Sequence, residues 1–157
     1  LQSAEHVTAQ EQFDVSEIML RVLVSLEGKI NSRHLDVDTQ LPEEPVKVWG
    51  DPDAITQVCY NLLDNAICAA AQAYPPEVYV RVRKTEEEYL LSVRNRVQRD
   101  VELPPDGQLP RTTRKEPGHG MGLSNVRDVL LRHGAEYTLS CRDNWFRFTC
   151  AVPTGNS

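Results

Sequence analysis

The chain has 157 residues, 40% of them hydrophobic, and a formal net charge of −6 with a sequence pI near 5.2. That length supports one hydrophobic core and is short for two domains of ordinary size, so we expect a single compact domain. The acidic balance excludes a general affinity for nucleic acid or anionic lipid, which needs clustered Lys and Arg, and no apolar run approaches the roughly 20 residues that span a bilayer.

The first predicted element is a helix over residues 14–33, since its apolar residues recur at helical spacing, and Asp14 and Glu17 are placed like a capping box at its start. The residues before it, 1–12, are expected to be a tail of a preceding helical region or disordered. Residues 34–41 and 46–49 alternate in polarity and predict two short strands around the turn at 42–45.

A second helix is predicted to begin after Asp51, which suits the N-cap position, and Pro52 is acceptable at the first helical position. Its apolar stripe continues for more than four turns and must pack against a sheet. Residues 78–82 and 89–93 then alternate on either side of the polar turn at 84–87, which predicts a β-hairpin.

The pattern disappears between about residues 98 and 119, a stretch rich in proline that we interpret as a lid over a site. A third helix is predicted from about Met121 to His133, with Gly134 as its stop. Two final strands, 137–141 and 145–152, are joined at Asp143-Asn144. The order predicts an α/β protein of the α+β kind, a two-layer sandwich of one mixed, mostly antiparallel sheet against three helices.

The four cysteines show no CxxC spacing, and we interpret all of them as packing residues rather than zinc ligands. Cys141 and Cys150 can face each other across the last hairpin, although a cytosolic setting would keep them reduced.

The second helix carries Asn61 and Asn65, one turn apart on the flank of its apolar stripe. Two carboxamides there can offer oxygen atoms to Mg²⁺ and amide hydrogens to phosphate without the repulsion that carboxylates would add beside a triphosphate. The alternative is a pair of solvated polar residues.

Two further segments can bind phosphate. Residues 118–122, Gly-His-Gly-Met-Gly, lie immediately before the third helix, whose N-terminus offers free amide hydrogens, and the alternative is a flexible entry turn. Residues 111–115, Arg-Thr-Thr-Arg-Lys, can neutralise a γ-phosphate and hydrogen-bond it, and the alternative is a solvated loop.

These segments together resemble the GHKL ATPase superfamily, and in particular the catalytic and ATP-binding domain of bacterial sensor histidine kinases, which has the Bergerat-type fold. Residues 51–66 resemble the family's asparagine box, residues 118–126 its second glycine box, and residues 112–114 the Ser/Thr-Thr-Lys element before that box. The resemblance covers about residues 13–153, so residues 154–157 are expected to be a tail.

Two departures from the family pattern stand out. The first glycine box is absent, and Asn95 occupies the place of the Asp that reads adenine, as in a subgroup that includes peptide quorum-sensing receptors. Cys68 replaces a Lys found in many relatives three residues after the second Asn of the box, so the charge at the phosphates is expected from Arg111, Arg114 or Lys115.

The resemblance implies a protein histidine kinase that binds ATP with Mg²⁺. Asn65 would help to bind the metal, and Asn61, Arg114 and Lys115 would act at the triphosphate. The remaining nucleotide-binding residues implied are Asn95, Thr113, Gly118, His119, Gly120, Met121, Gly122 and Leu123.

The resemblance also implies the partners: a histidine-bearing dimerisation hairpin of the same full-length kinase and a downstream response regulator. The piece itself is expected to be monomeric, to bind no nucleic acid, not to span a membrane and to lie in the cytoplasm as a domain of a membrane-anchored receptor. None of the four histidines has the setting of the phosphoacceptor.

Three other functions stay open. One is an ATP-driven conformational machine of the chaperone, topoisomerase or mismatch-repair kind, although those carry a water-activating Glu where this chain has Asn61. The others are a serine kinase of the anti-sigma type and a non-catalytic nucleotide-sensing or interaction module. Transfer to a hairpin supplied in trans would separate a kinase from a module.

Overall fold

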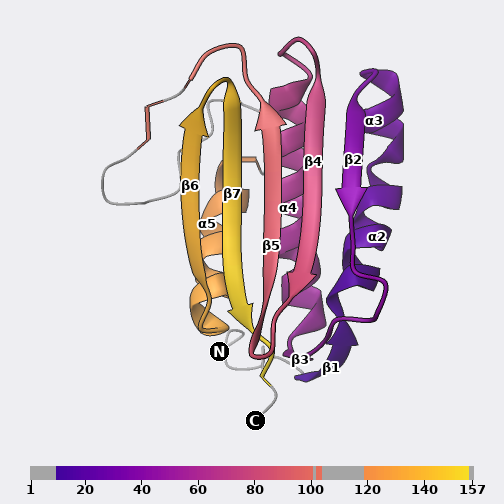
Figure 1. Cartoon of the computed structure of the whole chain (residues 1–157), viewed down its shortest axis with the longest axis vertical. Helices are drawn as coiled ribbons and strands as arrows, with labels where there is room; N and C mark the ends of the chain where they lie inside the picture. The colour runs from indigo at the N-terminus through magenta and orange to yellow at the C-terminus, as the bar shows by residue number, and fades with distance from the viewer. Residues whose placement is uncertain (1–9, 101, 104–118, 156–157) are drawn as a thin grey trace.

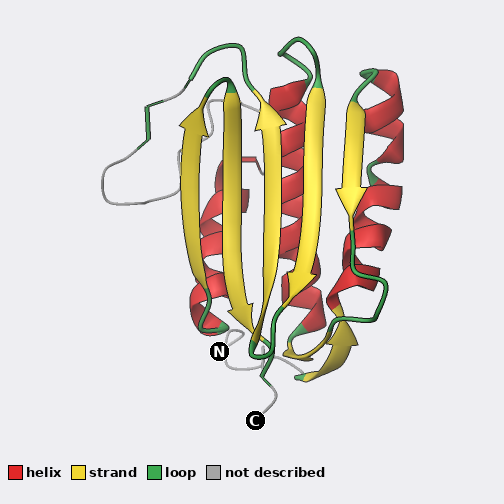
Figure 2. Cartoon of the chain, viewed as in Figure 1, coloured by secondary structure: helices red, strands yellow, loops and turns green. Residues whose placement is uncertain are grey.

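The chain folds into a layer of helices packed on one face of a five-stranded sheet, as Figures 1 and 2 show. The computed structural model describes residues 10–100, 102–103 and 119–155, and for residues 119–124 only the backbone. The expected lid, 98–119, therefore lies mostly outside the described residues. None of the described helices is both long and apolar enough to cross a membrane.

The large sheet has the strand order β2-β4-β5-β7-β6. Its strands are β2 (Asp36–Gln40), β4 (Glu77–Lys84), β5 (Glu88–Arg96), β6 (Glu136–Arg142) and β7 (Trp145–Pro153). Only β2 and β4 pair in parallel, and the other three pairs are antiparallel. The predicted mixed, mostly antiparallel sheet is thus confirmed.

The helical layer consists of α2 (Val15–Ser25), α3 (Glu27–Ser32), α4 (Pro52–Ala70) and α5 (His119–Arg132). The prediction of one helix over 14–33 was wrong, because the chain turns at Leu26, which has φ −99° and ψ 2°. The turn keeps Leu26 in the core at 1% exposure, whereas α3 has no buried residue. Gly28, a poor helix former, is the second residue of α3 after the turn.

A second, two-stranded sheet was not predicted. It joins β1 (Glu11–Asp14) to β3 (Lys47–Gly50) in antiparallel register. Asp14 links this sheet to the helical layer, since its Oδ1 accepts hydrogen bonds from the backbone of Ser16 at the start of α2 and of Val46 next to β3, both at 3.0 Å. Asp14 is therefore the predicted N-cap, but the reciprocal Glu17 contact is replaced by an ion pair between Glu17 and Arg21.

The last hairpin turns at Asp143-Asn144 as predicted, and both residues have positive φ, as a two-residue hairpin turn requires. The register places Cys141 opposite Phe146 and Cys150 opposite Tyr137. The possibility that Cys141 and Cys150 face each other across the hairpin is therefore excluded. None of the four cysteines, all of which the structure describes, forms a disulfide.

Burial separates Cys59 and Cys150 from Cys141, and chemical labelling can detect the difference. Cys59 and Cys150 lie in the core, and desolvation raises the pKa of both, that of Cys59 from 9.0 to about 12. We expect a thiol reagent at neutral pH to modify the half-buried Cys141 in the native protein, and Cys59 and Cys150 only on unfolding. Mass spectrometry of the labelled peptides along a urea gradient measures this order, and modification of Cys59 in the native protein would contradict it.

Candidate functional site

Helix α4 positions the candidate site. Asp51 caps it as predicted, since its Oδ1 accepts from the backbone of Asp53 at 3.1 Å and of Ala54 at 3.2 Å, with Pro52 in the first turn. The apolar stripe of α4 packs against the sheet and between α2 and α5, and Leu63 and Ile67 are fully buried. A long, capped and buried helix gives the polar residues on its flank fixed positions.

Asn61 and Asn65 are half-buried on that flank, as predicted. The Asn65 Nδ2 donates to the backbone carbonyl of Asn61 at 2.7 Å, and the Gln57 Nε2 donates to the Asn61 Oδ1 at 3.2 Å. These bonds orient both carboxamides. The Asn65 nitrogen is thus engaged by the helix backbone. The carboxamide oxygens of the pair are the atoms suited to bind a hard cation such as Mg²⁺.

The start of α5 lies at the level of Asn65. At the other end of α5, the His133 Nε2 accepts a hydrogen bond of 3.3 Å from the Asp51 backbone, so the end of α5 is held at the start of α4. The two helices run side by side in opposite directions (Figure 1). His119 lies 14 residues before His133, and Asn65 lies 14 residues after Asp51, so equal rise per residue brings the N-terminus of α5 beside Asn65.

The glycine segment was predicted to lie before the helix, but α5 begins at His119. Gly120, Met121, Gly122 and Leu123 therefore belong to the first turns of α5. The first backbone N–H groups of a helix have no partner within it, and for this reason the helical segment still presents donors suited to an anion.

The remaining residues predicted to contact the phosphates lie outside the described part of the chain. They are Arg111, Thr112, Thr113, Arg114, Lys115 and Gly118.

Asn95, predicted to face adenine, lies on β5 and is 4% exposed. It belongs to the row of β5 that points toward the helices, together with Tyr89, Leu91 and Val93. Its Nδ2 donates to the carbonyl of Arg96 at 3.1 Å. A buried carboxamide in an otherwise apolar row can recognise a polar ring edge, as the prediction requires.

Two cations that the sequence analysis missed approach α4 from α3. The Lys29 Nζ donates to the Asp64 Oδ1 at 2.7 Å, and the Arg33 Nη1 lies 3.5 Å from the Cys68 Sγ. The hydrogen bond to Asp64 raises the pKa of Lys29 and outweighs the opposing effect of burial. Arg33 thus brings a positive charge to the position at which Cys68 departs from the family pattern. Both pairs join residues 35 positions apart, and no local sequence pattern predicts such contacts.

The comparisons with known proteins agree with this arrangement. A GHKL domain model matches residues 51–153. The adaptive-response sensory kinase SasA of Trichormus variabilis is 26% identical over 94% of this chain, and the kinase/phosphatase MprB of Mycolicibacterium paratuberculosis is 31% identical over 79% of it. The chain spans only 39% and 24% of the lengths of these two proteins.

A solved structure has the same fold. The catalytic domain of histidine kinase ThkA superposes with a TM-score of 0.78 at 26% identity, over 92% of this chain and 97% of that domain. ThkA has also been solved in complex with the response regulator protein TrrA. With the asparagine pair on α4, the start of α5 beside it and a family model that covers most of the chain, this protein belongs to the GHKL domain family and has the fold of a histidine kinase catalytic domain.

Proposed function

We propose that residues 13–153 form the ATP-binding catalytic domain of a two-component sensor histidine kinase. It binds Mg-ATP and transfers the γ-phosphoryl group to a histidine on a dimerisation hairpin of the full-length kinase, on the cytoplasmic side of a membrane-anchored receptor. The observation that supports this most directly is the position of Asn61 and Asn65 beside the N-terminus of α5. A metal ligand and an anion site would adjoin there, as a metal-bound triphosphate requires.

The residues present fit Mg-ATP. Asn65 would hold the metal and Asn61 would lie beside the triphosphate, with the backbone of residues 119–122 at the phosphates and Asn95 at adenine. Arg33 would supply positive charge from α3, where it reaches Cys68. Bound Mg²⁺ would neutralise charge on the phosphates, and the protein would position the reacting groups.

Calorimetry with a non-hydrolysable ATP analogue tests nucleotide binding. We expect affinity to increase when Mg²⁺ replaces a chelator, because the carboxamide oxygens act through the metal. Absence of binding in both buffers would contradict the proposal. It would favour an interaction module with a kinase fold, an alternative to which the missing first glycine box points.

Phosphoryl transfer needs a separate experiment. A histidine-bearing hairpin from the full-length kinase, supplied in trans with labelled ATP, is expected to become phosphorylated on histidine. Magnesium-dependent binding without transfer would instead indicate a non-catalytic nucleotide sensor. A response regulator is the proposed downstream partner, as in the ThkA complex.

A further inference from the structure

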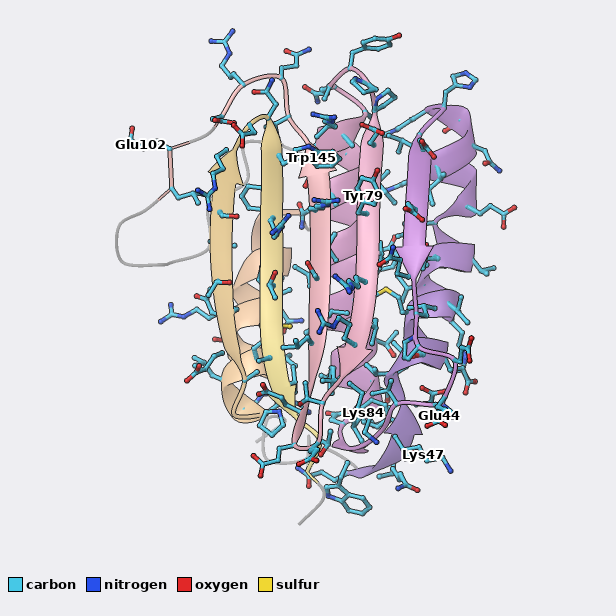
Figure 3. The ribbon with its side chains drawn as sticks, in the orientation of Figure 1. Glu44, Lys47, Tyr79, Lys84, Glu102 and Trp145 are labelled. Carbon is cyan, nitrogen blue, oxygen red and sulfur yellow. The ribbon has the colours of Figure 1, made fainter. Side chains whose placement is uncertain are left out.

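The sheet face opposite the helices, which Figure 3 turns toward the viewer, carries a basic groove. The groove has a volume of about 330 Å³ and crosses β4, β5 and β7. Four of its ten lining residues are arginines, Arg81, Arg83, Arg94 and Arg147. None of the ten is acidic, although the whole chain has a net charge of −6.

The strand register brings like charges together in this groove. Arg94 on β5 lies directly opposite Arg147 on β7, and on its other side Arg94 lies opposite Tyr79 on β4. Like charges directly opposite each other destabilise a sheet. The repulsion within this pair opposes folding, whereas an anion lying between the two guanidinium groups would stabilise it.

The groove arginines also lack carboxylate partners among the described residues. The basic residues that form ion pairs in the described part of the chain are Arg21, Lys29 and Arg96, and none of them lines the groove. Arg94 instead lies over the rings of Tyr79, at 4.3 Å, and Trp145, at 4.9 Å.

The two rings are 5.3 Å apart and lie near one end of the groove, where Figure 3 labels them. Contact with two rings holds the Arg94 guanidinium in place without neutralising its charge. Asp38, which is in register with Tyr79 on β2, is not part of the groove lining.

We propose that this groove binds an acidic segment of a protein partner. Charge complementarity identifies the segment as rich in Asp and Glu, whose carboxylates accept paired hydrogen bonds from guanidinium groups. Arg, Tyr and Trp are the residue types most enriched at the energetic centres of protein interfaces, and lysine, which is depleted there, is absent from the lining. Figure 2 shows the helices on one face of the sheet, and Tyr79, Arg81 and Arg83 alternate with the buried residues of β4. The groove therefore lies on the face away from α4, and the proposal does not depend on nucleotide binding.

Fluorescence anisotropy with a labelled peptide of alternating glutamate and serine tests the proposal, with a lysine-serine peptide as the charge-reversed probe. We expect only the acidic peptide to bind, with affinity reduced at least about tenfold by the double substitution R94S/R147S. A second variant, R81S/R83S, changes two exposed residues outside the stacked cluster and is expected to weaken binding similarly. The matched control, R127S/R132S, removes the same charge from exposed positions on α5 and is expected to bind as the unmodified domain does.

Several outcomes would overturn the proposal: equal binding of both peptides, equal loss in the α5 control, or no loss in either groove variant. Tighter binding of a single-stranded oligonucleotide that the groove variants abolish would assign the surface to nucleic acid instead. Self-association in sedimentation that R94S/R147S abolishes would assign it to a second copy of the chain. R81S/R83S is expected to leave magnesium-dependent nucleotide binding unchanged, which separates this test from that of the proposed function.

Discussion

Replacement of Asn65 by alanine is expected to remove most of the magnesium-dependent affinity for ATP and to leave the fold intact. Loss of a group that holds a metal typically reduces affinity by at least about tenfold. The side chain is half-buried and does not fill the core, and it donates a hydrogen bond of 2.7 Å to the backbone of its own helix. Because alanine is the better helix former, stability should change little.

The measurement is calorimetric titration of both proteins with an ATP analogue, in Mg²⁺ and in a chelator. The affinities of Asn65→Ala and the unmodified domain should differ in Mg²⁺ and converge in the chelator. Thr56→Ala is the matched control, since Thr56 is an exposed residue of α4 whose hydroxyl also bonds the backbone of its own helix, at 2.7 Å from the Pro52 carbonyl. Unchanged affinity of Asn65→Ala in Mg²⁺ would exclude this residue as the metal ligand, and an equal loss in Thr56→Ala would show a general effect on the helix.

Local signals were sufficient to predict α4 and its asparagine pair. The cap at Asp51, the proline after it and the apolar stripe all lie within one segment, and burial of the stripe decides on which flank Asn61 and Asn65 lie. The turn at Asp143-Asn144 was equally local. It even determines the register, because a two-residue turn pairs Arg142 with Trp145, and counting back from that pair separates the two cysteines.

The features that sequence reasoning missed depend on contacts between distant segments. Strand β1 has a polar sequence, and it forms because it pairs with β3, more than 30 residues away, and because the Asp14 side chain accepts a hydrogen bond from Val46. The break at Leu26 interrupts no sequence pattern, because the helical spacing of apolar residues continues through it to Ile30. The turn instead follows from tertiary packing, which keeps Leu26 in the core and Ile30 partly buried against it. For the same reason the approach of Lys29 and Arg33 to α4 has no local sequence signal.

Removal of the Lys29 charge is expected to destabilise the domain measurably. The ammonium lies 2.7 Å from Asp64, whose side chain is only 11% exposed, whereas that of Lys29 is 39% exposed. Lys29→Met would leave the mostly buried carboxylate without this ammonium. Removal of one partner of a fully buried pair costs several kcal/mol, but solvent screens Lys29, and we therefore expect a loss of about 1–2 kcal/mol. Urea unfolding of both proteins near neutral pH measures it, with Lys84→Met as the control on an exposed lysine.

The same pair predicts how this difference depends on pH. Folding raises the pKa of Lys29 above 10.5, so the unfolded chain loses this proton first as the pH rises. The stabilisation by Lys29 is therefore fully present below about pH 10 and is lost as the pH passes through the raised pKa. Burial also raises the pKa of Cys59, Cys150 and Tyr89, so these groups ionise first in the unfolded chain. This lowers the stability of both proteins in alkali and cancels in the comparison. The unfolding free energies of the unmodified domain and Lys29→Met should thus converge in alkali, and a gap that stays constant there would show that the charge of Lys29 does not stabilise the fold.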